Sequence, residues 1–261
     1  MELLFSLGLS AFLALVAIYK KALTYFATLI AFLSSVVITY CGGIPAFLVL
    51  AMTFIGTLVA DKVSIRRKEQ IFDSTNEKHG RRDTIQILCN VGVATGAILL
   101  YGIFKDEKFF WVYASVMASS LADSMASEIG VLTKGKTFDL RTGEVVERGM
   151  SGGVSVLGLQ ASFVGAFIIA LTAMSFDLSL SLFFIVTLCG WIGAFIDSLL
   201  GAFLQVKYRC PICQKLTEKH VHCKHETVYQ SGIRWLNNDA VNLCNNVATF
   251  FLALAILTFL Y

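Results

Sequence analysis

The sequence predicts an all-α fold, a polytopic membrane helix bundle of about eight transmembrane helices that forms a single transmembrane domain over residues 1–261. Two observations predict it. The chain is 56% hydrophobic and 15% charged, with 21 Phe and 2 Pro, which is far more apolar than a soluble domain of this size. Eight apolar segments also approach the ~20 residues that a helix needs to cross a bilayer. These segments are residues 2–19, 22–40, 44–60, 84–104, 109–132, 153–175, 179–206 and 240–260.

The first apolar segment has the length of a signal peptide, but we expect it to remain as a helix. It begins with an acid, Glu2, and no basic residue, and no clear small-residue cleavage motif follows it. Little more than Lys20 and Lys21 separates it from the second segment. The predicted number of helices is therefore eight, give or take one.

Basic residues are concentrated in alternate connecting segments. These segments hold nineteen of the 21 Lys and Arg. Under the positive-inside rule they face the cytoplasm, which places both termini outside. We therefore expect a protein integral to the cytoplasmic membrane, and we read the net charge of +3 as a topology signal rather than as a sign of nucleic-acid binding. The basic segments are residues 20–21, 62–82, 134–148 and 207–234.

The fifth apolar segment carries two acids near its end, Asp123 and Glu128. At 3.6 residues per turn, Ser124, Ser127 and Glu128 share one helical face, and Asp123 lies one turn before Ser127. A carboxylate inside a membrane helix costs several kcal/mol unless it is paired, hydrated or bound to metal, so these acids indicate a functional site. The alternative is a helix end that frays into the lipid headgroups.

Polar residues of four other apolar segments lie in the same cytoplasmic half. Scattered polar residues would not favour one leaflet, so we expect a single polar chamber that opens to the cytoplasm. The stretches RDTIQILCN and NDAVNLCNN share the pattern D-x-x-[QN]-x-x-x-N, which fits a rearranged pseudo-symmetry and chance convergence equally well. The polar residues are Asp83, Gln86 and Asn90; Ser151 and Ser155; Asp197, Ser198 and Gln205; and Asn238, Asp239, Asn242 and Asn246.

This chamber has the ligands for a magnesium–phosphate complex. Asp123 and Asp197 are expected at similar depth, with Asp83 and Asp239 at neighbouring helix mouths, and such hard oxygen ligands suit Mg²⁺ rather than zinc. The stretch GMSGGVS, residues 149–155, would let its backbone amides approach an anion at the start of the sixth helix. The alternative for this stretch is close helix packing through small residues.

Residues 130–137, GVLTKGKT, match the pattern G-x-x-x-x-G-K-[ST] of a P-loop. That pattern binds phosphate where it joins a strand to a helix. Here it follows a membrane helix and leads into a short hairpin that we expect to turn at Thr142 and Gly143, so we reject a P-loop. The basic residues near the acids either contact phosphate or only set the topology. They are Arg82, Lys134, Lys136 and Arg148.

The last predicted cytoplasmic loop, residues 207–236, contains three of the chain's seven Cys and three of its four His. Two of the cysteines have the two-residue spacing of a zinc knuckle, and the third could complete a four-ligand site together with one histidine. Disulfides are rare in the cytoplasm, so structural zinc is favoured over free thiols. The predicted ligands are Cys210, Cys213, His222 and Cys223, with His220 and His225 open as alternatives to His222.

The motifs RDTIQILCNVG, ADSMASEIG, GMSGGVS, DSLLGAFLQ and NNDAVN resemble, in order and spacing, an integral membrane family long catalogued as a domain of unknown function, whose plant member is phytyl-phosphate kinase. The resemblance covers about residues 60–260. It implies phosphoryl transfer from a nucleoside triphosphate, CTP in the plant case, to an isoprenoid monophosphate. The site residues that it implies are Asp83, Asn90, Asp123, Glu128, Ser151, Gly152, Gly153, Asp197, Asn238, Asp239 and Asn242.

The predicted function is therefore a membrane-bound phosphotransferase, with Mg²⁺ and a nucleoside triphosphate, an isoprenoid phosphate as substrate, and structural zinc. Phosphoryl transfer mainly needs alignment and charge neutralisation, which these residues can supply. A transporter or translocase of a lipid phosphate is the leading alternative, and a zinc-braced scaffold is the third. Membrane lipids are expected partners, nucleic acid is not, and the sequence leaves oligomerisation and the nucleotide base open.

Overall fold

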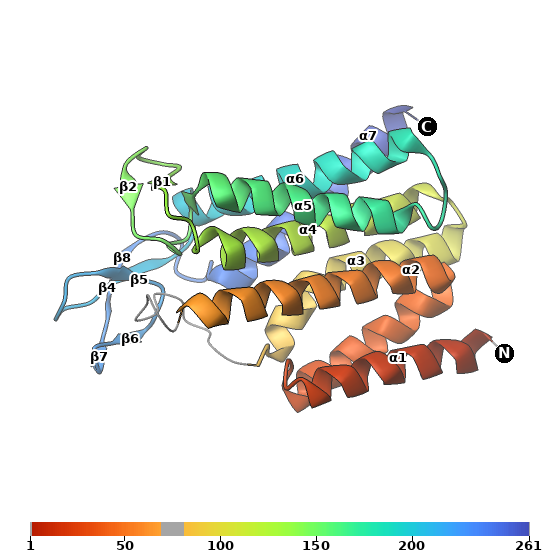
Figure 1. The fold of residues 1–261 in the computed structure, drawn as a ribbon, viewed down its shortest axis with the longest axis horizontal. Helices are drawn as coiled ribbons and strands as arrows, with labels where there is room; N and C mark the ends of the chain where they lie inside the picture. The colour runs from red at the N-terminus through yellow and green to blue at the C-terminus, as the bar shows by residue number, and fades with distance from the viewer. Residues whose placement is uncertain (1, 69–80, 261) are drawn as a thin grey trace.

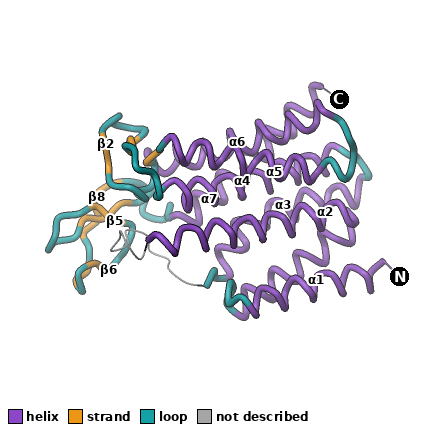
Figure 2. The backbone as a smooth tube through the Cα atoms, viewed as in Figure 1, coloured by secondary structure: helices purple, strands orange, loops and turns teal. Residues whose placement is uncertain are grey.

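The computed structural model describes residues 2–68 and 81–260 and shows a helical bundle with short β-strands at one end (Figures 1 and 2). Six of its helices are long and apolar enough to cross a membrane. Most of the expected segments agree with these helices to within a few residues. The helices are α1 Glu2–Tyr19, α2 Tyr25–Lys68, α3 Thr84–Phe104, α4 Lys108–Gly130, α5 Val156–Ala173, α6 Leu180–Phe203 and α7 Asn238–Leu260.

The helix labelled α2 consists of two arms that reverse direction, as Figure 1 shows. Gly43 lies between the arms with φ 67° and ψ −160°, which is not a helical conformation. Pro45 follows it and cannot donate a hydrogen bond to the preceding turn. The expected segments 22–40 and 44–60 correspond to these two arms, although the second arm continues to Lys68.

Helix α4 runs through the middle of the bundle. Its residues 110–122 are all buried, and Trp111 and Tyr113 are among the largest fully buried side chains. The Tyr113 hydroxyl donates a hydrogen bond to the carbonyl oxygen of Ala46 at 2.7 Å, which satisfies its polar atom inside the apolar core. The other helices therefore separate most of α4 from the surroundings.

Side-chain caps fix where several helices begin. Asp83 accepts a hydrogen bond from the Gln86 backbone N–H at 3.0 Å, and the Gln86 side chain accepts one from the Asp83 N–H at 3.2 Å. This capping box starts α3 at the expected residue. Ser155 caps α5 by accepting a hydrogen bond from the Gly158 N–H. Helix α5 therefore begins at Val156. We had expected the stretch 149–155 to begin this helix, but it precedes the helix.

The strands form two three-stranded sheets and one two-stranded ribbon, all at the end of the bundle away from both termini (Figures 1 and 2). The sheet orders are β2-β1-β3 and β5-β4-β8, and β6 pairs with β7. The predicted hairpin after residue 137 is confirmed, because β1 pairs antiparallel with β2 and Gly143 has φ 70°. The strands are β1 Thr137–Asp139, β2 Val145–Val146, β3 Gly153–Val154, β4 Lys207–Arg209, β5 Leu216–Thr217, β6 Val221–His222, β7 His225–Glu226 and β8 Val228–Ser231.

A buried ion pair connects the first two sheets. Lys207 Nζ of β4 lies 3.8 Å from Asp139 Oδ2 of β1, and both side chains are 7% exposed. Burial lowers the pKa of Lys207, and the neighbouring Asp139 carboxylate opposes that shift. The pair holds β1 against residues 207–236, here called the Cys/His loop, near the strand-bearing end of α6.

Candidate functional site

A polar cavity of about 110 Å³ lies between α4, α5, α6 and the stretch 149–155. Asp123 of α4 and Asp197 of α6 both line it. Their carboxyl groups are close enough to interact, so two acids 74 positions apart in the sequence meet in one cavity. Two carboxyl groups this close need a proton or a cation between them, because their negative charges repel.

The stretch 149–155 forms another part of the wall of this cavity. Its residues all line the cavity, and Gly152 has φ 79°, in the left-handed region that favours glycine. A Cβ atom at Gly152 would overlap the backbone of Ala202 in α6. At Gly201 a Cβ would lie 3.1 Å from the Gly152 nitrogen. The small residues therefore let this stretch lie directly against α6 beside Asp197.

The acids fit a hard divalent cation. Oδ1 of Asp197 is buried and has no hydrogen-bond partner among the residues that the structure describes. A buried carboxylate oxygen without a donor is costly unless a positive charge satisfies it. Carboxylate and hydroxyl oxygens are the ligands that Mg²⁺ takes, usually together with water and phosphate. Ser127 and Ser198 bring hydroxyl groups to the same cavity.

Comparison with known proteins identifies a family whose match includes all the residues that line this cavity. Residues 8–250 match the family described as "Integral membrane protein DUF92". The chain belongs to the DUF92 family.

Several curated relatives share most of the length of this DUF92 chain. Protein PGR of Arabidopsis thaliana is 25% identical over 278 aligned positions, covering 96% of this chain and 94% of the relative. An uncharacterized membrane protein of Synechocystis is 31% identical and covers 76% of this chain and 79% of the relative. Protein VTE6, chloroplastic, of Arabidopsis thaliana is 24% identical and covers 78% and 56%. No solved structure matches the chain significantly.

The structure brings some of the predicted DUF92 site residues to the cavity and leaves others away from it. Asp239 is buried in the first turn of α7, next to the cavity-lining Asn238, but it is not itself in the cavity wall. Glu128 lies outside the wall. Asn242 is buried in α7 and also lies outside the wall. The predicted residues that line the cavity are Asp123, Asp197, Ser151, Gly152, Gly153, Ser155 and Asn238.

The amino-terminal part of α3 lies away from this cavity. Asp83, predicted as a site acid, caps α3, which gives its carboxylate a structural role. Asn90 donates its side-chain N–H to the Gln86 carbonyl oxygen at 2.9 Å and lines a different cavity. Of the basic candidates, Lys136 is exposed and Arg148 is half-buried, and neither lines the polar cavity.

Ser124, Ser127 and Glu128 lie on the expected side of α4, which is helical through all three residues, but they do not share one cavity. Ser127 lines the polar cavity with Asp123, whereas Ser124 lines a second cavity on another side of α4. Positions three apart on a helix differ by about 60° in direction. A tightly packed helix can therefore present them to different neighbours.

Sequence reasoning missed the polar contacts that hold α7 against α4. Asn245 Oδ1 accepts a hydrogen bond from Ser119 at 3.2 Å, and Asn246 Oδ1 accepts one from Ser120 at 3.1 Å. Asn246 also donates to the Cys89 carbonyl oxygen of α3 at 2.8 Å. The adjacent amides Asn245 and Asn246 could have indicated these contacts, because amide side chains in membrane helices often form hydrogen bonds to neighbouring helices.

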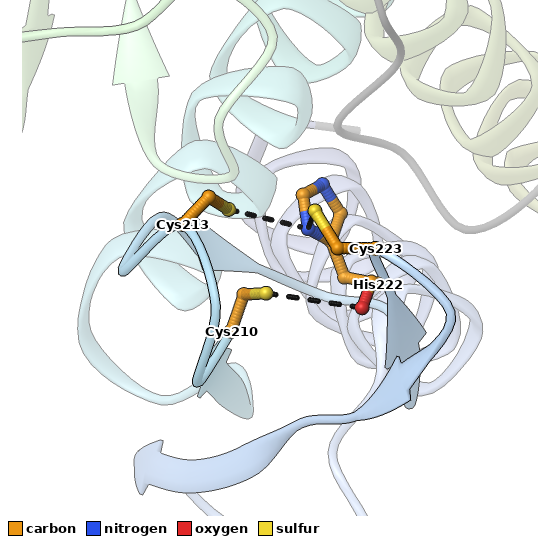
Figure 3. Close-up of side chains that lie close together, drawn as sticks. All are labelled: Cys210, Cys213, His222 and Cys223. Carbon is orange, nitrogen blue, oxygen red and sulfur yellow. Dashed lines mark hydrogen bonds between the residues drawn. The ribbon is translucent and has the colours of Figure 1, made fainter.

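The predicted zinc ligands form a compact cluster in the Cys/His loop (Figure 3). One ligand atom from each of the four residues lies within 4.8 Å of the others. His222 Nδ1 lies 3.4 Å from Cys213 Sγ and 3.3 Å from Cys223 Sγ. Such spacings fit a tetrahedron around zinc, whose bonds are about 2.0–2.3 Å long. The geometry selects His222 from the three candidate histidines, because His220 and His225 are not in the cluster.

Proposed function

We propose that this protein is a nucleotide-dependent kinase that phosphorylates an isoprenoid monophosphate to give the diphosphate. The observation that carries the proposal is the meeting of Asp123 and Asp197 in one cavity that the glycine-rich stretch 149–155 also lines. Its DUF92 membership and the resemblance of its motifs to the plant phytyl-phosphate kinase support the same reaction class. CTP is the nucleotide that this resemblance implies.

The two walls of the cavity have complementary roles in this reaction. Asp123 and Asp197 would hold Mg²⁺, which supplies charge neutralisation and orientation for the phosphates when bound. The stretch 149–155 offers backbone amides and the Ser151 hydroxyl as donors to phosphate oxygens. Asn238 adds an amide at the α7 side of the cavity. The acceptor is already an anion, so the reaction needs no general base.

We propose that the bundle crosses the membrane eight times, with α2 counting as two crossings and the strand-bearing end in the cytoplasm. The loops that hold most of the basic residues are at this end, and the positive-inside rule places such loops in the cytoplasm. Lys78 belongs to the same predicted loop but lies outside the described residues. Under this topology the acid pair is on the side where nucleoside triphosphates are found.

An apolar far end favours an enzyme over a transporter. Phe110 of α4 stacks on Phe176 with ring centroids 3.9 Å apart, and Tyr101 and Trp111 pack edge-on against Phe176. These rings fill the end of the bundle that carries the termini. A transporter would need a polar path through this region in at least one conformation.

The direct test is an assay of purified protein with Mg²⁺, a panel of nucleoside triphosphates and prenyl monophosphates. We expect nucleotide-dependent formation of prenyl diphosphate. Asp197→Asn should lower the rate by at least about 100-fold, because it removes charge where phosphates must be neutralised. Asp177→Asn, which changes an exposed acid at the far end, is the matched control and should keep the wild-type rate. Equal rates in the two variants would remove the acid pair from the mechanism.

We also propose that Cys210, Cys213, His222 and Cys223 bind a structural zinc ion. Four protein ligands close the coordination shell, so this metal would stabilise the loop between α6 and α7 rather than act on substrate. Metal analysis of protein purified without added zinc should find about one zinc per chain. A protein that contains no zinc and is insensitive to chelators would contradict this assignment.

A further inference from the structure

A second cavity, of about 100 Å³, lies on another side of α4 and is mostly apolar. It is enclosed by α1, both arms of α2, α3 and α4. Its wall extends along the second arm of α2 from Asp61 to Leu50, which is about 16 Å at 1.5 Å per residue. Its deeper wall includes Leu13, Phe54 and Met117. The shape and composition suit an elongated hydrocarbon.

One cation stands at the strand-bearing end of this cavity. Arg82 Nη2 lies 3.4 Å from Asp61 Oδ1, a long contact that uses one of the five guanidinium donors. The backbone of Arg82 is fixed, because its N–H donates to Ala22 and its carbonyl oxygen accepts from Thr24. Arg82 is also close enough for its charge to act on Asp123. A guanidinium held at the mouth of an apolar cavity matches a lipid with an anionic head.

Helix α4 lies between the two cavities, and adjacent residues of this helix line different cavities. Asp123 lines the polar cavity and Ser124 the apolar one. A ligand with its head at Arg82 would therefore lie on the Ser124 side of α4, one residue along the helix from Asp123. Its tail would extend away from the polar cavity, among the aliphatic side chains.

We propose that the apolar cavity holds the isoprenoid chain of the acceptor, with its phosphate bound by Arg82 next to Asp123. This inference rests on the proposed kinase function and names the site of the acceptor. Each isoprenoid unit adds four carbon–carbon bonds, about 5 Å when extended, so about three units match in length the 16 Å of the second α2 arm that lines the cavity. The cavity provides an internal site for this chain.

Donor and acceptor then approach the acid pair from two sides of α4. An acceptor phosphate oxygen attacks the terminal phosphorus of the nucleotide, a new P–O bond forms, and the bond to the bridging oxygen breaks. The nucleoside diphosphate leaves with that electron pair. The total charge is unchanged and no proton is released, so no further reactant is needed.

The test fills the cavity without touching the polar site. Ala14 lines the apolar cavity, and Ala11, one turn away on α1, is exposed. Ala14→Phe should raise the KM for farnesyl and geranylgeranyl phosphate at least about tenfold, and leave the KM for nucleotide and the turnover of dimethylallyl phosphate unchanged. Ala11→Phe, with the same added ring, should behave as wild type. If Ala14→Phe lowers the melting temperature, Ala31→Leu narrows the same cavity from the first arm of α2.

Binding provides a second measurement that does not depend on catalysis. The melting temperature in detergent should rise with chain length from dimethylallyl to farnesyl phosphate, and Ala14→Phe should abolish that dependence. Arg82→Gln should remove the difference between farnesyl phosphate and farnesol. Chain-length-dependent stabilisation without turnover would leave this site standing and reject the kinase function. Turnover with no difference between Ala14→Phe and Ala11→Phe at any chain length would overturn the cavity assignment.

Discussion

Replacing Gly152 by Ala tests whether the stretch 149–155 must lie against α6. Gly152 has φ 79°, and a non-glycine residue there costs about 1 kcal/mol. The added Cβ would overlap the backbone of Ala202, which cannot yield as a side-chain tip would. Restoring van der Waals separation needs a displacement of about 1 Å, and overpacking of this kind costs a further ~1–3 kcal/mol.

The expected result is a large loss of rate in a protein that still folds. A displacement of about 1 Å in a positioning group can lower a rate by about 100-fold, and we expect a loss of that order in prenyl diphosphate formation. Gly143→Ala is the matched control, because Gly143 also has a positive φ, of 70°, but no atom lies within 4 Å of its added Cβ. It should cost only ~1 kcal/mol of stability and keep its activity. Near-normal turnover in Gly152→Ala would refute the close approach of this stretch to the reacting phosphates.

Three further predictions concern the surroundings of the site. Asp83→Ala removes the α3 cap and should lower the free energy of unfolding by about 1 kcal/mol with little change in KM, as measured by denaturation and kinetics; a complete loss of activity in folded protein would instead make Asp83 catalytic. His222→Ala should lower the zinc content and the melting temperature, whereas His225→Ala should change neither; equal zinc loss in both would reject the selected ligand. Asp139→Ala leaves Lys207 buried without its carboxylate and should destabilise the protein by about 3 kcal/mol; an unchanged melting temperature would show that the pair contributes nothing.

The sequence predicted the helices well because their signals are local. Apolar runs of membrane length need no knowledge of neighbours, and the capping box at Asp83 marks the start of α3 by residues three apart. The reversal in α2 was predicted as a gap near residues 41–43, and Gly43 occupies it. Local signals were misleading at the stretch 149–155, which we expected to begin a helix. Ser155 caps the helix, so α5 begins only at Val156.

The site was predicted only in part because it depends on how helices rotate against each other. Pattern reasoning placed Asp123 and Asp197 in one half of the bundle, and the structure places both in the wall of one cavity. It could not tell that Ser124 turns toward a different cavity, since that depends on side-chain packing around α4. It also grouped Asp83 with the site acids, although the side chain is used locally as a cap.

The central position of α4 explains why a membrane protein can carry these acids. Helix α4 is not among the six helices that composition alone identifies as membrane spans, because its later half is rich in polar residues. Its residues 110–122 are nevertheless buried, so the neighbouring helices supply the apolar surface in its place. Asp123 follows directly after this buried run, where α5 and α6 leave the polar cavity open. A helix shielded in this way can keep carboxylates at a depth where a lipid-facing helix could not, since the cost of an intramembrane charge falls when it faces other protein groups, water or a cation. The least hydrophobic helix of the bundle is therefore the one that can carry the acids of the proposed reaction between a nucleotide and a membrane lipid.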